Sequence, residues 1–323
     1  MTKPIHAVIV CSLFASCCFA QAPPVKVLPW NGHKAAASLT FDDALPVHLD
    51  IAAPALKERH LSGTFFLIVS RTTRIEDWKR VLLDGNEIGN HSVSHEDPNS
   101  LTAEQAERQI SDAKDFFTAN LGSTPETYAY PYAQLTAQAR DKALEHSFLA
   151  RGWHAVPNTP YLTLGCGLDW FNVPSLATNT ETSPAEVRGW VDTDLSRSAW
   201  VVLQIHGIGK DTGFDPVSRD TFFALLDKVQ EAQEKSDLWV APFGEVGAYW
   251  RATDIFEQST FEREMRGGAY HWNIPSNFPA GVVLKVKALA SLRLYQHGKQ
   301  LKADKAGFFP LSFDSQSLKV VSQ

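Results

Sequence analysis

The stretch that decides the fold is a short apolar run that ends on two carboxylates, Ala37-Ser38-Leu39-Thr40-Phe41-Asp42-Asp43. A run of this kind predicts a buried β-strand. Four later stretches are strand candidates of the same type, at residues 64–69, 148–151, 200–205 and 238–241. Helical patterns lie between them, so the alternation predicts strand–helix units around a parallel sheet.

The segments between these strands have helical apolar faces. Thr102-Ala103-Glu104-Gln105 predicts a capping box at a helix start. The apolar residues that follow repeat at steps of four, three and four: Ala106, Ile110, Ala113 and Phe117. Phe222, Leu226 and Val229 repeat in the same way later. Roughly seven strand–helix units between residues 35 and 250 favour a closed or nearly closed barrel over an open sheet.

The pattern changes after about residue 253. Residues 281–288 alternate apolar and polar side chains, and His297-Gly298 predicts a turn after a further extended stretch. Residues 308–313 and 318–321 are also strand candidates. We therefore divide the chain into a barrel domain at residues 21–253 and a small all-β domain at residues 254–323. A domain of that size without disulfides is only marginally stable by itself, so we expect it to depend on contacts with the barrel for its stability.

The first twenty residues are typical of a secretory signal peptide, with Lys3 before an apolar stretch and cleavage after Ala20. The expected location is secreted or periplasmic. Processing removes three of the four cysteines and leaves Cys166, which excludes an intrachain disulfide. An alternative is a lipoprotein signal with Cys17 lipidated. It ranks second because Phe14 stands where such signals have a smaller aliphatic residue.

Composition limits the classes of partner. Apolar residues make up 44% and charged residues 20% of the 323-residue chain, which excludes disorder as the main state. Thirty Lys and Arg face thirty-six Asp and Glu, with no long basic run, so we expect no nucleic-acid partner. No later segment is apolar enough to span a membrane, so we expect no stable membrane insertion. The oligomeric state stays open.

Acidic and histidine side chains fall at predicted strand ends. Asp42 and Asp43 are adjacent, so one can ligate a metal while the other faces a substrate; capping and solvation are the alternative. His91 and His95 are four residues apart and can converge on one ion where the backbone turns, although two surface histidines would have the same spacing. One aspartate and two histidines form a facial set for Zn²⁺, or for Co²⁺ or Ni²⁺. His206 ends the strand at residues 200–205.

Five short motifs in order give the sequence a family resemblance: Thr40-Phe41-Asp42-Asp43, His91-Ser92-Val93-Ser94-His95, Tyr130-Pro131-Tyr132, Asp169-Trp170 and Leu203-Gln204-Ile205-His206. Over about residues 30 to 250 the chain resembles the polysaccharide deacetylases of carbohydrate esterase family 4, which have the NodB-homology fold. The resemblance implies a distorted (β/α)₇ barrel and removal of acetyl groups from glycans such as chitin, peptidoglycan or acetylxylan.

The resemblance also implies roles for individual residues. Asp43, His91 and His95 would hold the divalent metal, with zinc the first choice. Asp42 would be the general base and His206 the general acid. The resemblance assigns three further residues to substrate binding. The Tyr132 backbone N–H would form part of an oxyanion hole, and Trp170 and Leu203 would line an acetyl pocket.

Two departures from the family pattern concern groups around the base and the acid. Ala129 stands where the third motif usually has an arginine, and Ala133 replaces a glycine. Cys166 stands where the fourth motif usually has an acid, which removes the expected partner of His206 and leaves Asp169 as a possible one. The missing groups normally tune the base and orient the acid.

The sequence therefore predicts a metal-dependent hydrolase that removes O- or N-linked acetyl groups from a polysaccharide or oligosaccharide. One alternative is a C–N hydrolase of a small non-sugar amide on the same barrel. Another is a catalytically inactive glycan-binding protein, suggested by Ala129, Cys166 and the extra domain. Retention of all five candidate catalytic and metal residues argues against the inactive form.

Overall fold

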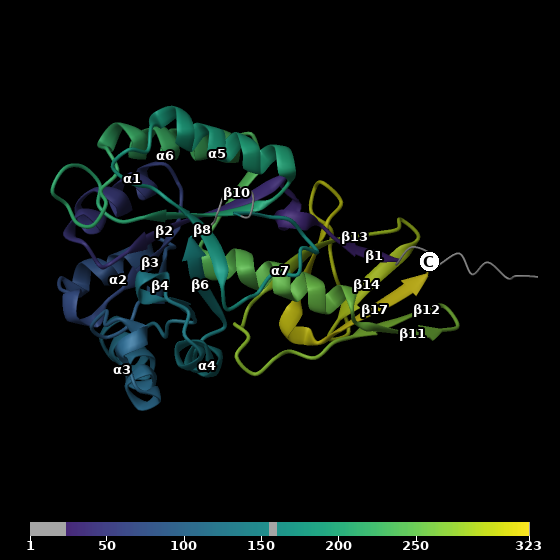
Figure 1. Ribbon diagram of the computed structural model, residues 1–323. Coiled ribbons are helices and arrows are strands. Elements are labelled where there is room, and N and C mark those ends of the chain that lie inside the picture. The colour runs from purple at the N-terminus through teal and green to yellow at the C-terminus, as the bar shows by residue number, and fades with distance from the viewer. Residues whose placement is uncertain (1–23, 155–159, 323) are drawn as a thin grey trace, which may run out of the picture.

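A computed structural model describes residues 24–154 and 160–322 (Figure 1). Seven parallel strands close into a barrel, because the first of them pairs with both the second and the last. In barrel order these strands are β2 (Ala35–Asp42), β3 (Gly63–Leu67), β4 (Glu87–Asn90), β5 (Thr127–Ala129), β6 (Leu149–His154), β8 (Val173–Ala177) and β9 (Trp200–Ile205). The predicted distorted (β/α)₇ barrel is confirmed.

Two further strands extend this sheet: β7 (Tyr161–Leu162) pairs antiparallel with β9, and β10 (Leu238–Val240) pairs parallel with β2. The α-helices are α1 (Ala53–Glu58), α2 (Ile75–Leu83), α3 (Ala103–Leu121), α4 (Ala137–His146), α5 (Pro184–Arg197), α6 (Arg219–Glu234) and α7 (Phe243–Glu257). The capping box predicted at Thr102 and Gln105 is present at the start of α3.

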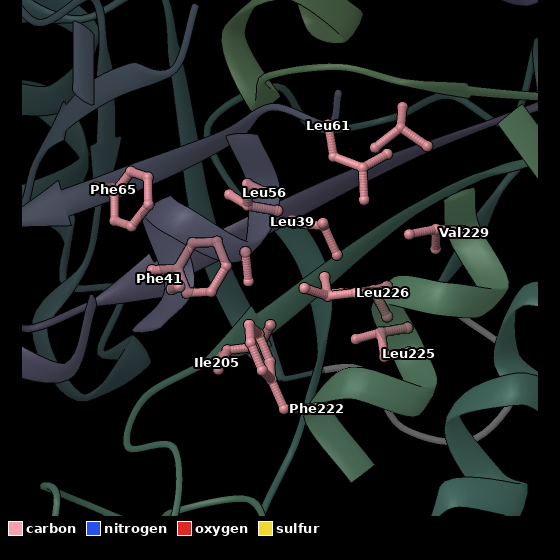
Figure 2. Close-up of a cluster of buried hydrophobic side chains, with 14 of the residues drawn as sticks. Leu39, Phe41, Leu56, Leu61, Phe65, Ile205, Phe222, Leu225, Leu226 and Val229 are labelled. Carbon is pink, nitrogen blue, oxygen red and sulfur yellow. The ribbon is translucent and has the colours of Figure 1, made fainter. Parts of the chain in front are cut away.

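Side chains of the barrel strands alternate between two environments. One set packs against the surrounding helices: Figure 2 shows Leu39, Phe41 and Ile205 near Phe222, Leu225 and Leu226 of α6. The other set, which includes Thr40 and Asp42 of β2, points into the barrel. This alternation decides which residues of each strand can reach the mouth.

Helix α7 packs beneath the end of the barrel where the strands begin. The Trp250 ring lies 5.3 Å from the ring of Trp30, which precedes β2, and 6.2 Å from that of Trp200, the first residue of β9. Figure 1 shows α7 between the barrel and the C-terminal strands. The opposite end, where the strands finish, is therefore the open mouth.

The C-terminal strands form two sheets. The three-stranded sheet has the order β1 (Val25–Val27), β13 (Val283–Ala288) and β16 (Phe309–Ser312). The five-stranded sheet has the order β11 (Thr260–Glu264), β12 (Gly267–His271), β17 (Ser317–Ser322), β14 (Leu292–Gln296) and β15 (Lys299–Gln300). The predicted β-rich character of this region is confirmed, while the domain boundary at residue 253 stays a prediction.

The N-terminal strand β1 belongs to the C-terminal module, because Val25 pairs with Ala288 and Val27 with Val286. The predicted signal peptide at residues 1–20 and Cys17 lie outside the described residues. Within the described ranges, no helix is both long enough and apolar enough to cross a membrane.

Candidate active site

Asp42, Asp43, His91, His95 and His206 come together at the mouth of the barrel. Asp42 is the last residue of β2, His91 follows the last residue of β4, and His206 follows the last residue of β9. The carboxyl ends of parallel strands meet at one end of a barrel, which is why residues distant in sequence converge here.

Asp43, His91 and His95 form a group that can hold a metal ion. Oδ1 of Asp43 lies 3.8 Å from Nε2 of His91 and 3.7 Å from Nε2 of His95. The same oxygen is buried and has no hydrogen-bond partner among the described residues, although the Arg71 guanidinium is 3.4 Å away. A buried carboxylate oxygen that has no hydrogen bond and faces two imidazole nitrogens suits Zn²⁺ or a similar ion.

The backbone between the two histidines explains their convergence. Ser92 has φ +75° and His95 has φ +59°, so the chain turns sharply after β4. The Ser92 N–H donates to Oδ1 of Asn90 at 2.8 Å, and the His95 N–H donates to Oγ of Ser92 at 2.9 Å. The two imidazole rings end with centroids 4.8 Å apart.

The surroundings of both imidazoles favour the neutral form, which is the form that can bind a metal ion. Nδ1 of His91 hydrogen-bonds the carbonyl of Ala129 at 2.8 Å, which makes it the protonated nitrogen and leaves Nε2 toward Asp43. Burial lowers the pKa of His91. Burial and the neighbouring His91 lower the pKa of His95 to about 4.

Asp42 lies in a separate network inside the barrel. Arg151 donates two hydrogen bonds to the Asp42 carboxylate, from Nη1 to Oδ1 at 2.9 Å and from Nη2 to Oδ2. Nε2 of Gln204 donates a third, to Oδ2 at 2.9 Å. Asp42 and Arg151 are 1% and 2% exposed. Burial alone would raise the pKa of Asp42, but Arg151, His91 and His206 outweigh it and hold that pKa well below its usual range.

The expectation that Ala129 leaves Asp42 without a neighbouring guanidinium is wrong, because Arg151 supplies one. Ala129 of β5 and Arg151 of β6 are direct register partners. Paired residues on neighbouring parallel strands project to the same face of the sheet, so an arginine at either position points into the barrel. Sequence reasoning missed this residue; an arginine inside the predicted buried strand at residues 148–151 was the available signal.

His206 lies beside Asp42, with its Nε2 3.6 Å from Oδ2 of the aspartate. Nδ1 of His206 is buried and has no hydrogen-bond partner within the described part of the chain. Behind it, Nε2 of the buried His48 donates to the His206 carbonyl at 2.9 Å. Asp42 is thus the carboxylate next to His206.

Asp169 and Trp170 lie elsewhere, so their predicted roles are wrong. Arg140 binds both carboxylate oxygens of Asp169 at 2.7 and 3.0 Å, which leaves Asp169 no part in orienting His206. The Trp170 ring packs 5.3 Å from Trp250, and its carbonyl accepts from Ala150 N–H near the start of β6. Both residues precede β8 and therefore lie toward the closed end of the barrel.

Leu203 does not line the mouth either. It is fully buried in the layer between sheet and helices, opposite its register partner Leu39. Side chains alternate along β9, so Gln204 points into the barrel and contacts Asp42. This role of Gln204 was not predicted from the sequence.

Tyr132 remains at the mouth. Its backbone has φ +56°, the residue is 59% exposed, and its ring centroid lies 4.5 Å from that of His95. The proposed oxyanion role of its N–H stays a prediction. Cys166 is an exposed free thiol.

A second cluster with suitable ligand types, Glu107, Glu145 and His146, lies on the surface of α3 and α4. Lys142 already neutralises it, with Nζ 3.0 Å from Glu107 and 2.7 Å from Glu145. An ion would have to displace this ammonium group, so the cluster at the mouth of the barrel is the better candidate for a metal site.

Residues 31–150 match the family model described as "Polysaccharide deacetylase". Among curated proteins, the chain is 34% identical over 107 residues to the peptidoglycan-N-acetylmuramic acid deacetylase PdaC of Bacillus subtilis, covering 32% of this chain and 23% of that protein. It is 28% identical over 131 residues to a peptidoglycan-N-acetylglucosamine deacetylase of Bacillus cereus, covering 39% and 46%. The chain therefore matches less than half of the length of these relatives.

Among solved structures, the chain resembles the crystal structure of the Bc1960 peptidoglycan N-acetylglucosamine deacetylase. The TM-score is 0.51 at 18% identity, over 68% of this chain and 91% of that one. This likeness supports the barrel fold.

Proposed function

We propose that this chain, which belongs to the polysaccharide deacetylase family, is a metal-dependent hydrolase that removes acetyl groups from a glycan. One observation carries the proposal: two adjacent aspartates are used differently. A buried oxygen of Asp43 that has no hydrogen bond among the described residues faces His91 and His95. Asp42 instead bonds Arg151 and Gln204.

Asp43, His91 and His95 would hold a divalent ion, with zinc the first choice and cobalt or nickel as alternatives. Such an ion supplies Lewis-acid polarisation and lowers the pKa of its water. The curated deacetylases named above carry activities on peptidoglycan in their names, which supports an acetylated glycan as the substrate class.

The chain's own residues supply the proton transfers. Asp42, kept ionised by Arg151, accepts a proton from the attacking water. His206, 3.6 Å from Asp42, delivers a proton to the departing oxygen or nitrogen of the sugar. The Tyr132 N–H donates to the developing oxyanion.

We further propose a preference for O-acetyl over N-acetyl groups. An amine must be protonated to leave, and no partner among the described residues fixes the imidazolium of His206 through Nδ1. We also propose that the signal peptide at residues 1–20 directs the protein to the cell exterior or the periplasm.

The test is acetate release from acetylxylan, chitooligosaccharides and peptidoglycan, by the wild type and by Asp42→Asn. The variant should retain its metal and lose roughly 10²-fold or more in kcat, the scale of general-base catalysis. Loss of metal with full activity after reconstitution would mean that the two aspartates are assigned in reverse. Hydrolysis of small amides alone would favour the C–N hydrolase, and glycan binding without acetate release would favour the inactive protein.

A further inference from the structure

Two exposed aromatic side chains lie against imidazoles of the candidate active site. Phe214 is 68% exposed, and its ring centroid is 5.2 Å from that of His206 with the planes at 77°. Tyr132, 59% exposed, packs in the same way on His95. Among the exposed large hydrophobic side chains of the described ranges, these are the two aromatic ones. Exposed aromatic surface is therefore concentrated at the mouth.

Phe214 is presented by an ordered turn between β9 and α6. Its carbonyl accepts from the Gly207 N–H at 3.3 Å, and the Val217 N–H donates to the Gly207 carbonyl at 2.9 Å. Gly213 has φ +136°, and a Cβ there would lie 2.5 Å from a methyl carbon of Leu45. The glycine lets the turn lie on Leu45 while the next side chain points outward.

We propose that Phe214 is a sugar-binding residue that stacks on the pyranose ring carrying the acetyl group, an assignment that rests on the proposed function. His206 delivers a proton to the atom that joins the acetyl group to the sugar. The ring that bears this atom must lie beside His206 and therefore beside Phe214.

The chemistry of the side chain defines the ligand class. A phenyl ring has no charge and no hydrogen-bonding group, so it selects an apolar surface. The C–H face of a pyranose is such a surface, and its hydrogens are attracted to the negative face of an aromatic ring. A small acyclic acetyl compound offers no comparable face. Phe214 therefore favours glycans over small non-sugar substrates.

The experiment compares wild type and Phe214→Ala on an acetylated xylooligosaccharide and on glycerol triacetate, a small ester without a sugar ring. We expect KM for the oligosaccharide to rise about three- to tenfold, the scale of one aromatic contact, with kcat within about twofold. Kinetics on glycerol triacetate should stay unchanged. Phe214→Trp should restore oligosaccharide affinity.

Leu83→Ala is the matched control, because Leu83 is 85% exposed at the end of α2, beside the start of β4 and away from the mouth. It should leave both substrates unaffected. Calorimetric titration with the deacetylated xylooligosaccharide measures affinity without turnover and should show the same loss in Phe214→Ala.

Equal losses on both substrates would overturn the proposal, since Phe214 would then only support His206. Unchanged kinetics and unchanged affinity would overturn it as well. If the wild type releases no acetate but Phe214→Ala still weakens oligosaccharide binding, the sugar-binding role stands and the proposed function fails.

Discussion

Arg151 is the residue on which the environment of Asp42 depends. It is buried, it bonds the carboxylate through two nitrogens, and its Nη1 also donates to Oγ1 of Thr40 at 2.7 Å. Breaking such a buried pair leaves an uncompensated charge, which costs about 3–5 kcal/mol. Arg151 is thus a positioning residue for the proposed base.

Ala129 pairs with Arg151 across neighbouring strands, so the role of Arg151 can be tested by moving the arginine to position 129. Arg151→Ala should lower kcat by roughly 10- to 100-fold, the loss expected when a general base is misplaced. The double variant Ala129→Arg, Arg151→Ala should recover most of that loss, because the guanidinium re-enters the barrel from the adjacent strand. Steady-state kinetics of folded proteins, checked by circular dichroism, give the answer. A double variant no better than Arg151→Ala would contradict the role.

The sequence predicted the five polar residues that converge at the mouth, because each stands at the carboxyl end of a strand or in the turn after it. It did not predict Arg151 or Gln204. Their contacts depend on strand register and on alternation across the sheet, and neither is visible in a single sequence. Trp170 and Leu203 were misplaced for the same reason: a motif gives the order of residues but not the end or face of the barrel.

At the scale of elements, the longer strands were predicted well. The strand predicted at residues 200–205 coincides with β9, and that at 37–41 lies within β2. Strands β5 and β8 were not predicted from the sequence. β5 has only three residues, and Pro174 interrupts the apolar pattern of β8.

Helix α5 contains a buried acid, Asp194. Asp194 is 0% exposed, and neither carboxylate oxygen has a hydrogen bond among the described residues. Burial raises its pKa well above the usual value. A raised folded-state pKa contributes stability that is fully present below the unfolded pKa and is lost as pH rises through the folded value.

Asp194→Asn removes this titration. At pH 8 the variant should be more stable than the wild type by about 1–3 kcal/mol, because the folded wild type must hold a proton that its unfolded chain releases, and the difference should shrink toward pH 4. Urea unfolding at both pH values measures it. A variant less stable than the wild type at pH 8 would show that Asp194 has a favourable role.

At the scale of the whole molecule, the barrel and the C-terminal strands share one apolar core. Phe256 of α7 packs on Tyr270 at 5.1 Å and on Trp272 at 5.5 Å between ring centroids, and all three are buried. Tyr270 and Trp272 are therefore core residues and do not form an exposed aromatic platform. Phe278 is half-buried and packs 5.1 Å from Phe148 of the barrel region.

We therefore predict that residues 254–323 stabilise the barrel. Phe256→Ala should lower the free energy of unfolding by about 3–5 kcal/mol, which is typical of a buried aromatic deletion. The protein should still unfold in a single transition, at a lower melting temperature. A chain ending at Thr253 should be insoluble or melt early, because β1 would also lose its partner β13. Calorimetry tests both. A truncated chain that melts like the full one and loses only polymer affinity would instead identify a binding module.

The most direct test of the central claim is acetate release from an acetylated glycan by protein stripped with a chelator, before and after addition of Zn²⁺ or Co²⁺. We predict negligible release from the stripped wild type, recovery on adding one equivalent of metal, and no recovery for His95→Ala, whose metal content should stay low. Full activity after chelation, or metal binding by His95→Ala equal to that of the wild type, would contradict the assignment of Asp43, His91 and His95 as the metal site.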